Sequence, residues 1–132
     1  MPSIEGGGVE KNLFIIANFL STKIKDLNLI TASKGFDHKF KGLKIVKPSF
    51  NYWANSKRKY KYLICLLKLL RLIINKKNIT VFAFQANLYC ILLCKIFNRK
   101  IIIRSNSSPS GWSNSFIKKK IFTSILGLAD RI

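Results

Sequence analysis

The sequence predicts an α/β fold in which a parallel sheet is covered by helices on both faces. Short apolar runs, rich in β-branched and aromatic residues, alternate with segments of helical periodicity, and this order is typical of parallel strands joined by crossover helices. The chain has 132 residues and is 48% hydrophobic, which is enough for one domain with a packed core. We therefore expect a single α/β domain over residues 1–132.

A glycine turn and a helix come first. Residues 9–23 carry apolar side chains at helical spacing, and Glu10 falls in the first turn, where its charge favours the helix dipole. Directly before this helix stand Gly6, Gly7 and Gly8. Glycine allows positive φ and close approach of a ligand, and a helix N-terminus attracts phosphate. The turn is either a phosphate-binding loop or a flexible start to the chain, and it matches neither the Walker pattern nor the complete G-x-G-x-x-G pattern.

Two strands follow, with a polar loop between them. Residues 27–33 alternate as a strand, and residues 42–48 form a second strand that ends at Pro48. The loop contains His38, the only histidine of the chain, which we expect to be exposed to solvent. A Ser-His-Asp catalytic triad therefore finds no support in the sequence.

The rest of the chain alternates helices with strands. We expect, in order, a long helix at 56–78, a strand at 79–84, a helix at 87–97, a strand at 100–104, a helix at 116–128 and the start of a further strand at 129–132. In parallel α/β sheets, ligands bind at the carboxyl ends of the strands. The polar residues that follow the strands at 79–84 and 100–104 are therefore candidates for a ligand cleft: Gln85, Asn87, Arg104, Ser105 and Asn106.

Arg104 ends a buried apolar strand, and two roles are open for its side chain. Its guanidinium either binds an anionic ligand in the cleft or pairs with a backbone carbonyl or with the end of the helix at 116–128. We favour the cleft, because a guanidinium at the carboxyl edge of a sheet is well placed to bind phosphate.

The three cysteines are expected to be buried structural thiols in a reducing compartment. Cys65, Cys90 and Cys94 all lie in apolar surroundings. Cys90 and Cys94 are four residues apart and share one helix face, but the sequence nearby offers no further ligand to complete a metal site. We expect no metal and no cofactor.

The formal net charge of +19 predicts attraction to anionic partners, although the bias toward Lys, Ile and Asn is also typical of AT-rich coding. The basic helix at 56–78 either lies on an anionic membrane surface or packs on the sheet with its lysines solvated. Lys68 and Arg71 interrupt its apolar run, so it is not expected to span a bilayer. Basic and aromatic residues are interleaved at 50–62, but no known DNA- or RNA-binding module is present, so we do not favour nucleic acid as a partner.

Three stretches together resemble the N-terminal half of retaining GT-B glycosyltransferases, in particular the subfamily-4-like N-terminal domain. They are "PSIEGGGVEKNLFIIANFL", "ITVFAFQANLYCILLCKIFNRKIIIRSNSSP" and "LADRI". The resemblance extends over essentially all 132 residues. The Gly-Gly-x-Glu element and the late Ala-Asp-Arg-Ile element are moderately specific together and weak when taken singly.

The resemblance implies a Rossmann-like domain that holds the acceptor, facing a second domain that holds a nucleotide-sugar. The glycine turn is then expected to approach the donor diphosphate. The activity implied is hexosyl transfer from a nucleotide-sugar to a glycan or lipid-linked acceptor in cell-surface polysaccharide synthesis, in the cytoplasm or at the inner face of the cell membrane. The alternative is a small basic module that binds a membrane surface or nucleic acid without enzyme activity.

The sequence departs from the family in several places. Many relatives carry histidines where this chain has Gln85 and, approximately, Asn106. These two amides are able to bind sugar hydroxyls but are not general bases, so the catalytic residues remain unknown. The family's first strand is expected before Met1, and its nucleotide-sugar domain after Ile132. We therefore expect a fragment that is inactive alone.

Overall fold

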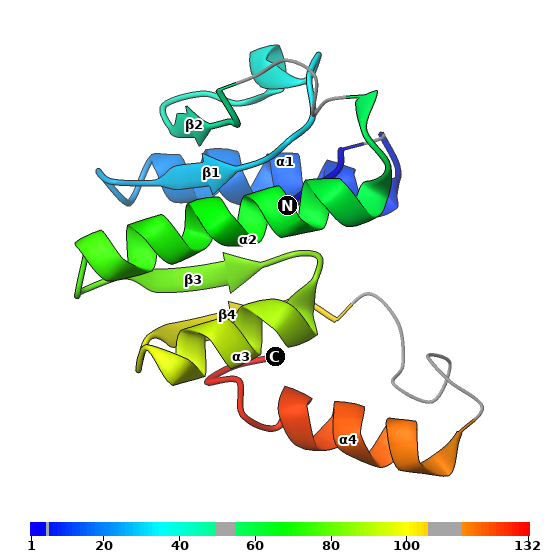
Figure 1. Ribbon diagram of the computed structural model, residues 1–132. Helices are drawn as coiled ribbons and strands as arrows, with labels where there is room; N and C mark the ends of the chain where they lie inside the picture. The colour runs from blue at the N-terminus through cyan, green and yellow to red at the C-terminus, as the bar shows by residue number, and fades with distance from the viewer. Residues whose placement is uncertain (5, 50–54, 106–114) are drawn as a thin grey trace. The chain divides into compact units, whose positions relative to one another are not determined.

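The computed structural model describes the chain except for residues 5, 50–54 and 106–114 (Figure 1). The described residues form a mixed α/β structure with four α-helices and two short, two-stranded parallel sheets. They divide into two compact units, Met1–Leu69 and Leu70–Ile132. The α/β class and the parallel pairing predicted from the sequence are confirmed. The single continuous sheet of a Rossmann-like domain is not among the strand pairings of the described residues.

The first unit contains helix α1 (Gly8–Ser21) and strands β1 (Asn28–Ile30) and β2 (Lys44–Val46). The two strands pair in parallel, with Leu29 opposite Ile45. The core of this unit consists of buried apolar side chains from the N-terminal segment, α1, β1 with the residues that follow it, and α2: Ile4, Leu13, Ala17, Leu29, Ala32, Cys65 and Leu69.

The N-terminal segment lies alongside the end of β1. The backbone N–H of Ala32 donates to the carbonyl of Pro2 at 3.2 Å, and the Met1 ammonium donates to the carbonyl of Ile30 at 2.8 Å. The segment Met1–Ile4 therefore runs next to β1 and leads directly into the glycine turn and α1. No strand was predicted for this stretch, because it is short and contains a proline and a serine.

The loop between β1 and β2 packs on α1. It contains a short 3₁₀ helix (Asp37–Lys39), and Phe36 and Phe40 on either side place their rings 6.0 and 5.2 Å from the ring of Phe14. The Asn18 side chain fixes the loop as well, since its amide nitrogen donates to the carbonyl of Lys39 at 2.8 Å. His38 is exposed, as predicted.

Helix α2 (Arg58–Asn75) contributes residues to both units. The second unit continues with β3 (Thr80–Ala83), α3 (Asn87–Ile96), β4 (Lys100–Ile103) and α4 (Phe116–Leu126). Strands β3 and β4 pair in parallel along their whole length. The predicted start of a further strand is present as a parallel bridge between Ile102 and Arg131.

The sequence explains why α3 ends where it does. Asn98 adopts the left-handed conformation, with φ 51°. Its N–H donates to the carbonyl of Lys95 at 3.1 Å, and the N–H of Arg99 donates to the carbonyl of Cys94 at 2.7 Å. This pair of bonds is the Schellman motif, for which asparagine is a common substitute for glycine. The chain then turns directly into β4.

The predicted helices agree with the structure to within a few residues at each end, whereas the strands are shorter than predicted. Among the described residues, α2 is the longest helix, and none of the described helices has the length and apolar character that crossing a membrane requires.

Candidate functional site

The glycine turn lies at the N-terminus of α1 and is exposed. Gly7 is the N-cap residue, and Gly6 adopts φ +86°, which favours glycine over any other residue. A Cβ built at Gly8 meets no heavy atom within 4 Å, and the φ of Gly8 is not positive. The fold therefore requires glycine at position 6 but offers no steric or conformational reason for glycine at position 8.

Glu10 folds back over this turn. Glu10 is only 7% exposed. Its Oε2 lies 2.9 Å from the position that a Cβ on Gly7 would occupy. A carboxylate in the first turn is stabilised by the helix dipole. The negative charge of Glu10 therefore occupies the Gly7 side of the turn and leaves the space beside Gly6 and Gly8 open.

Buried hydroxyl groups hold the turn in place from the end of β1. The Oγ of Ser33 accepts a hydrogen bond from the N–H of Ile4 at 2.7 Å, and the N–H of Ser33 donates to Oγ1 of Thr31 at 3.1 Å. Thr31 and Ser33 are 1% and 6% exposed. Neither residue was predicted as part of a site from the sequence. The signal that could have identified them is the pair of hydroxyls at alternate positions at the end of a predicted strand.

The carboxyl ends of β3 and β4 lie side by side in the second unit, as predicted. The N–H of Arg104 donates to the carbonyl of Ala83 at 3.0 Å, and Nδ2 of Asn87 donates to the carbonyl of Arg104 at 2.9 Å. The Oδ1 of Asn87 is buried and has no hydrogen-bond partner among the residues that the structure describes. The structure thus brings Asn87 and Arg104 together. The side-chain amide nitrogen of Asn87 bonds to the backbone, however, and its Oδ1 is shielded from solvent.

The side chain of Arg104 is half-buried and makes no hydrogen bond or ion pair with the described residues. Neither of the structural contacts considered for it is therefore present in that part of the chain. Arg99 differs, because its Nη2 donates to the carbonyl of Ile73 at 3.3 Å near the end of α2. Gln85 and Ser105 are half-buried and have interaction partners. Asn106 lies outside the described residues.

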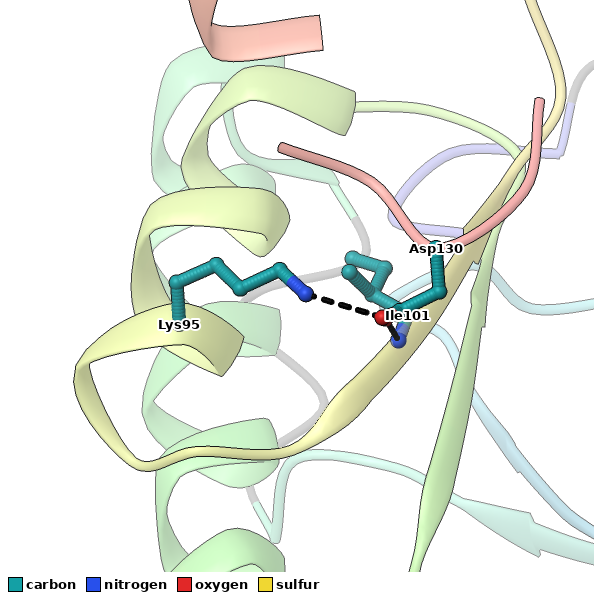
Figure 2. A network of polar contacts seen from close by, with 3 residues as sticks. All are labelled: Lys95, Ile101 and Asp130. Atoms are coloured by element: carbon teal, nitrogen blue, oxygen red, sulfur yellow. Dashed lines mark hydrogen bonds and ion pairs between the residues drawn. The ribbon is translucent and has the colours of Figure 1, made fainter. Parts of the chain in front are cut away.

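The C-terminal Ala-Asp-Arg-Ile element forms a small polar network on β4 (Figure 2). The carboxylate of Asp130 accepts a hydrogen bond from the N–H of Ile101 at 2.7 Å and pairs with Nζ of Lys95 at 3.0 Å. The hydrogen bond from the backbone of Ile101 and the contact with Lys95 lower the pKa of the Asp130 carboxyl below its usual range. Asp130 therefore has a structural role: it fastens the C-terminal segment to β4 and to α3.

The cysteines are free thiols. Cys65 and Cys94 are buried, as predicted, whereas Cys90 is half-buried. Burial raises the pKa of the Cys65 thiol, and it raises the pKa of Cys94 to about 12, with a further contribution from Cys90. Both groups stay protonated and unreactive near neutral pH. Within the described ranges, no three His, Cys, Asp or Glu side chains come together as a metal site.

Comparison of the chain with protein-family models, with curated proteins and with solved structures finds no match. The glycine turn of the first unit and the β3–β4 edge of the second unit are therefore assigned from sequence and geometry.

Proposed function

We propose that the chain is the acceptor-side, N-terminal domain of a GT-B glycosyltransferase that builds cell-surface polysaccharide. In this proposal its strands belong to one Rossmann-like sheet, and a second domain binds the nucleotide-sugar. The substrate class is a nucleotide-sugar donor with a glycan or lipid-linked acceptor, and no metal or cofactor is needed.

The observation that carries the proposal is the open space at Gly8. Replacing glycine by alanine where the backbone accepts alanine stabilises a protein by roughly 0.4–1 kcal/mol, and a Cβ at Gly8, the first residue of α1, meets no heavy atom within 4 Å. A ligand that approaches the backbone closely accounts for this glycine. The free N–H groups at the start of α1 then donate to a phosphate of the donor, and the helix dipole stabilises its charge.

A titration of the ¹⁵N-labelled chain with inorganic pyrophosphate tests this site by nuclear magnetic resonance. We expect the amide signals of Gly6–Gly8 to shift more than those of Gly35 and Gly42. These two glycines stand beside Lys34 and Lys41 and report attraction to the positive charge alone. If the signals of Gly35 and Gly42 shift as much, the anion binds without a site and the proposal loses its main support.

The Gly8→Ala variant separates ligand binding from folding. We expect it to raise the free energy of unfolding by about 0.5–1 kcal/mol, because the fold accepts the methyl group, and to weaken pyrophosphate binding because the ligand does not. Gly127→Ala is the matched control: Gly127 is also in the right-handed helical region, and its Cβ would meet only ordinary contacts at 3.5 Å and beyond. This control should leave pyrophosphate binding unchanged. Unchanged binding in Gly8→Ala would contradict the proposed role of the turn.

Arg104 is the residue of the second unit on which the proposal depends most. In an enzyme that joins this chain to a nucleotide-sugar domain, Arg104→Ala should lower the transfer rate at least about tenfold, or about 1.4 kcal/mol of transition-state stabilisation. Arg104→Lys should restore only part of the rate, because an ammonium group lacks the planar fork of the guanidinium. The melting temperature should not change in either variant. A variant that unfolds, or that transfers sugar at the original rate, would remove Arg104 from the cleft.

A further inference from the structure

Helix α2 is apolar on two faces, and the described residues cover only one of them. Cys65 and Leu69 are each 7% exposed and belong to the core of the first unit. On a different face of the same helix, Tyr60, Leu63 and Leu67 are 54%, 57% and 53% exposed. We call these three residues the α2 stripe. Their spacing of three and four residues places them in one row along the helix.

Positive charge surrounds the α2 stripe. Lys57, Arg58, Lys59, Lys61 and Lys68 lie on or directly before this part of the helix. The positions of Lys61 and Lys68 place them along one edge of the stripe, and both are half-buried. Long basic side chains extend apolar stems along a surface and keep their charged ends in water. Between Asp37 and Asp130 the chain contains no acidic residue. The exposed face is therefore apolar at its centre, and every charged residue on this helix is cationic.

We propose that the α2 stripe binds the surface of an anionic lipid bilayer. Helix α2, the long green helix in Figure 1, would lie in the plane of the interface, with Tyr60, Leu63 and Leu67 among the acyl chains and the lysines at the phosphate groups. Binding in the plane agrees with the absence of any membrane-crossing helix among the described residues. This inference stands independently of the proposed enzymatic function.

The chemistry of the stripe favours lipid over nucleic acid. Leucine side chains such as Leu63 and Leu67 gain free energy by entering an apolar phase, and the phosphate backbone of a nucleic acid offers no such phase. A protein that binds RNA or DNA through this helix would use its basic residues and stack bases on Tyr60, but it would not need the leucines. Substitution of the leucines, with every charge kept, therefore distinguishes the two partners.

The test is co-sedimentation of the full chain with lipid vesicles at about 0.15 M salt, where exposed charges are screened beyond roughly 8 Å. Vesicles of equal parts phosphatidylglycerol and phosphatidylcholine should bind the protein, and vesicles of phosphatidylcholine alone should not. The double variant Leu63→Ser/Leu67→Ser should lose at least about tenfold in its partition coefficient. Equal binding to both kinds of vesicle, or no binding to either, would overturn the proposal.

The matched control is Ile15→Ser/Phe19→Ser on α1. Ile15 and Phe19 are 68% and 62% exposed, so the control removes a comparable exposed apolar area from another helix. It should bind vesicles as the original protein does. A control that loses binding equally would show that apolar exposure in general, and not the α2 stripe, binds the vesicle.

Two further measurements keep the proposal falsifiable. If the serine variant melts at a lower temperature than the original protein, Leu67→Trp replaces it as the test. Tryptophan favours the membrane interface, so this variant should bind anionic vesicles several-fold more strongly. Vesicle binding that does not increase in Leu67→Trp would contradict the proposal. If single-stranded RNA binds the original protein and the serine variant equally well, and vesicles also bind both equally, the helix acts through charge alone and the lipid assignment is wrong.

Discussion

Each unit contains a turn that leads from an extended segment into a helix, and the two turns are built differently. The turn of the first unit has three exposed glycines, with Gly6 at φ +86°, and it is anchored by the Oγ of Ser33. The turn of the second unit has no glycine. Ala86 adopts φ 57° there, and Asn87 anchors the turn through its bond to the carbonyl of Arg104.

The difference shows how much glycine a turn of this kind needs. The second turn reaches a left-handed conformation at Ala86 with an ordinary L-residue, at a cost of roughly 1–2 kcal/mol. The first turn uses glycine where φ is positive, at Gly6, and also at Gly8, where φ is not positive and a Cβ would meet open space. In the proposed function, the additional glycine at position 8 is what makes the first turn suitable for a ligand.

The largest expected effect concerns the two anchors. Ser33→Ala removes the acceptor of the buried N–H of Ile4, and an unsatisfied buried donor costs about 1–3 kcal/mol. Asn87→Ala should cost less, about 1 kcal/mol, because its bond to Arg104 is only part-buried and the variant also removes a buried oxygen without a partner. Urea unfolding monitored by circular dichroism measures both values.

Ser49→Ala is the control for the anchors, since Ser49 is exposed and its loss should change the free energy of unfolding by less than about 0.5 kcal/mol. Equal losses in Ser33→Ala and Asn87→Ala would mean that burial does not distinguish the two turns.

The helices of this fold could be predicted from the sequence, whereas the anchors of the two turns could not. Periodicity located α1, α2, α3 and α4, because each helix has a long apolar face. The strands were predicted too long, since apolar character continues beyond the backbone pairing at residues such as Phe84. The pairing of Pro2 with Ala32 and the anchoring role of Ser33 could not be predicted, because both depend on contacts between residues about 30 positions apart.

The candidate site, too, could be predicted only in part, because side-chain contacts are not visible in the sequence. The carboxyl ends of β3 and β4 were expected at one edge, and the bond between Asn87 and Arg104 places them there. The backbone-directed use of the Asn87 amide was not foreseen, because the sequence does not reveal which atoms a side chain bonds. The guanidinium of Arg104 has no bonded partner among the described residues, whereas that of Arg99 donates to the carbonyl of Ile73, and the sequence alone does not distinguish the two.

A smaller effect is expected from pH, and it arises at Asp130 in the second unit. The pKa of Asp130 is lowered in the folded protein by its bonds to Ile101 and Lys95. The stabilisation is therefore present at pH values above the carboxyl's ordinary pKa of 3.8 and is lost as the pH falls through the lower, folded value. Melting temperatures between pH 6 and pH 3 should fall less steeply in Asp130→Asn than in the original chain.

Asp26→Asn is the control for the pH series. Asp26 is exposed and belongs to the first unit, so its substitution should leave the slope unchanged. If Asp26→Asn changes the slope as strongly as Asp130→Asn does, the acid sensitivity arises from general charge repulsion and not from the network on β4.

The smallest expected change in the free energy of unfolding is that of Ala86→Gly, which is the opposite exchange to Gly8→Ala. Ala86→Gly relieves the left-handed strain of an L-residue, roughly 1–2 kcal/mol, but gives the unfolded chain more freedom, which offsets about 0.4–1 kcal/mol of the gain. The net result should be a stabilisation of about 0.5 kcal/mol, measured by urea unfolding. Asn98→Gly is the matched control, because Asn98 has φ 51° and asparagine tolerates this region, so its gain should be smaller. Alanine for glycine in one turn and glycine for alanine in the other are then both stabilising, and a destabilised Ala86→Gly variant would show that the second turn carries no strain for glycine to remove.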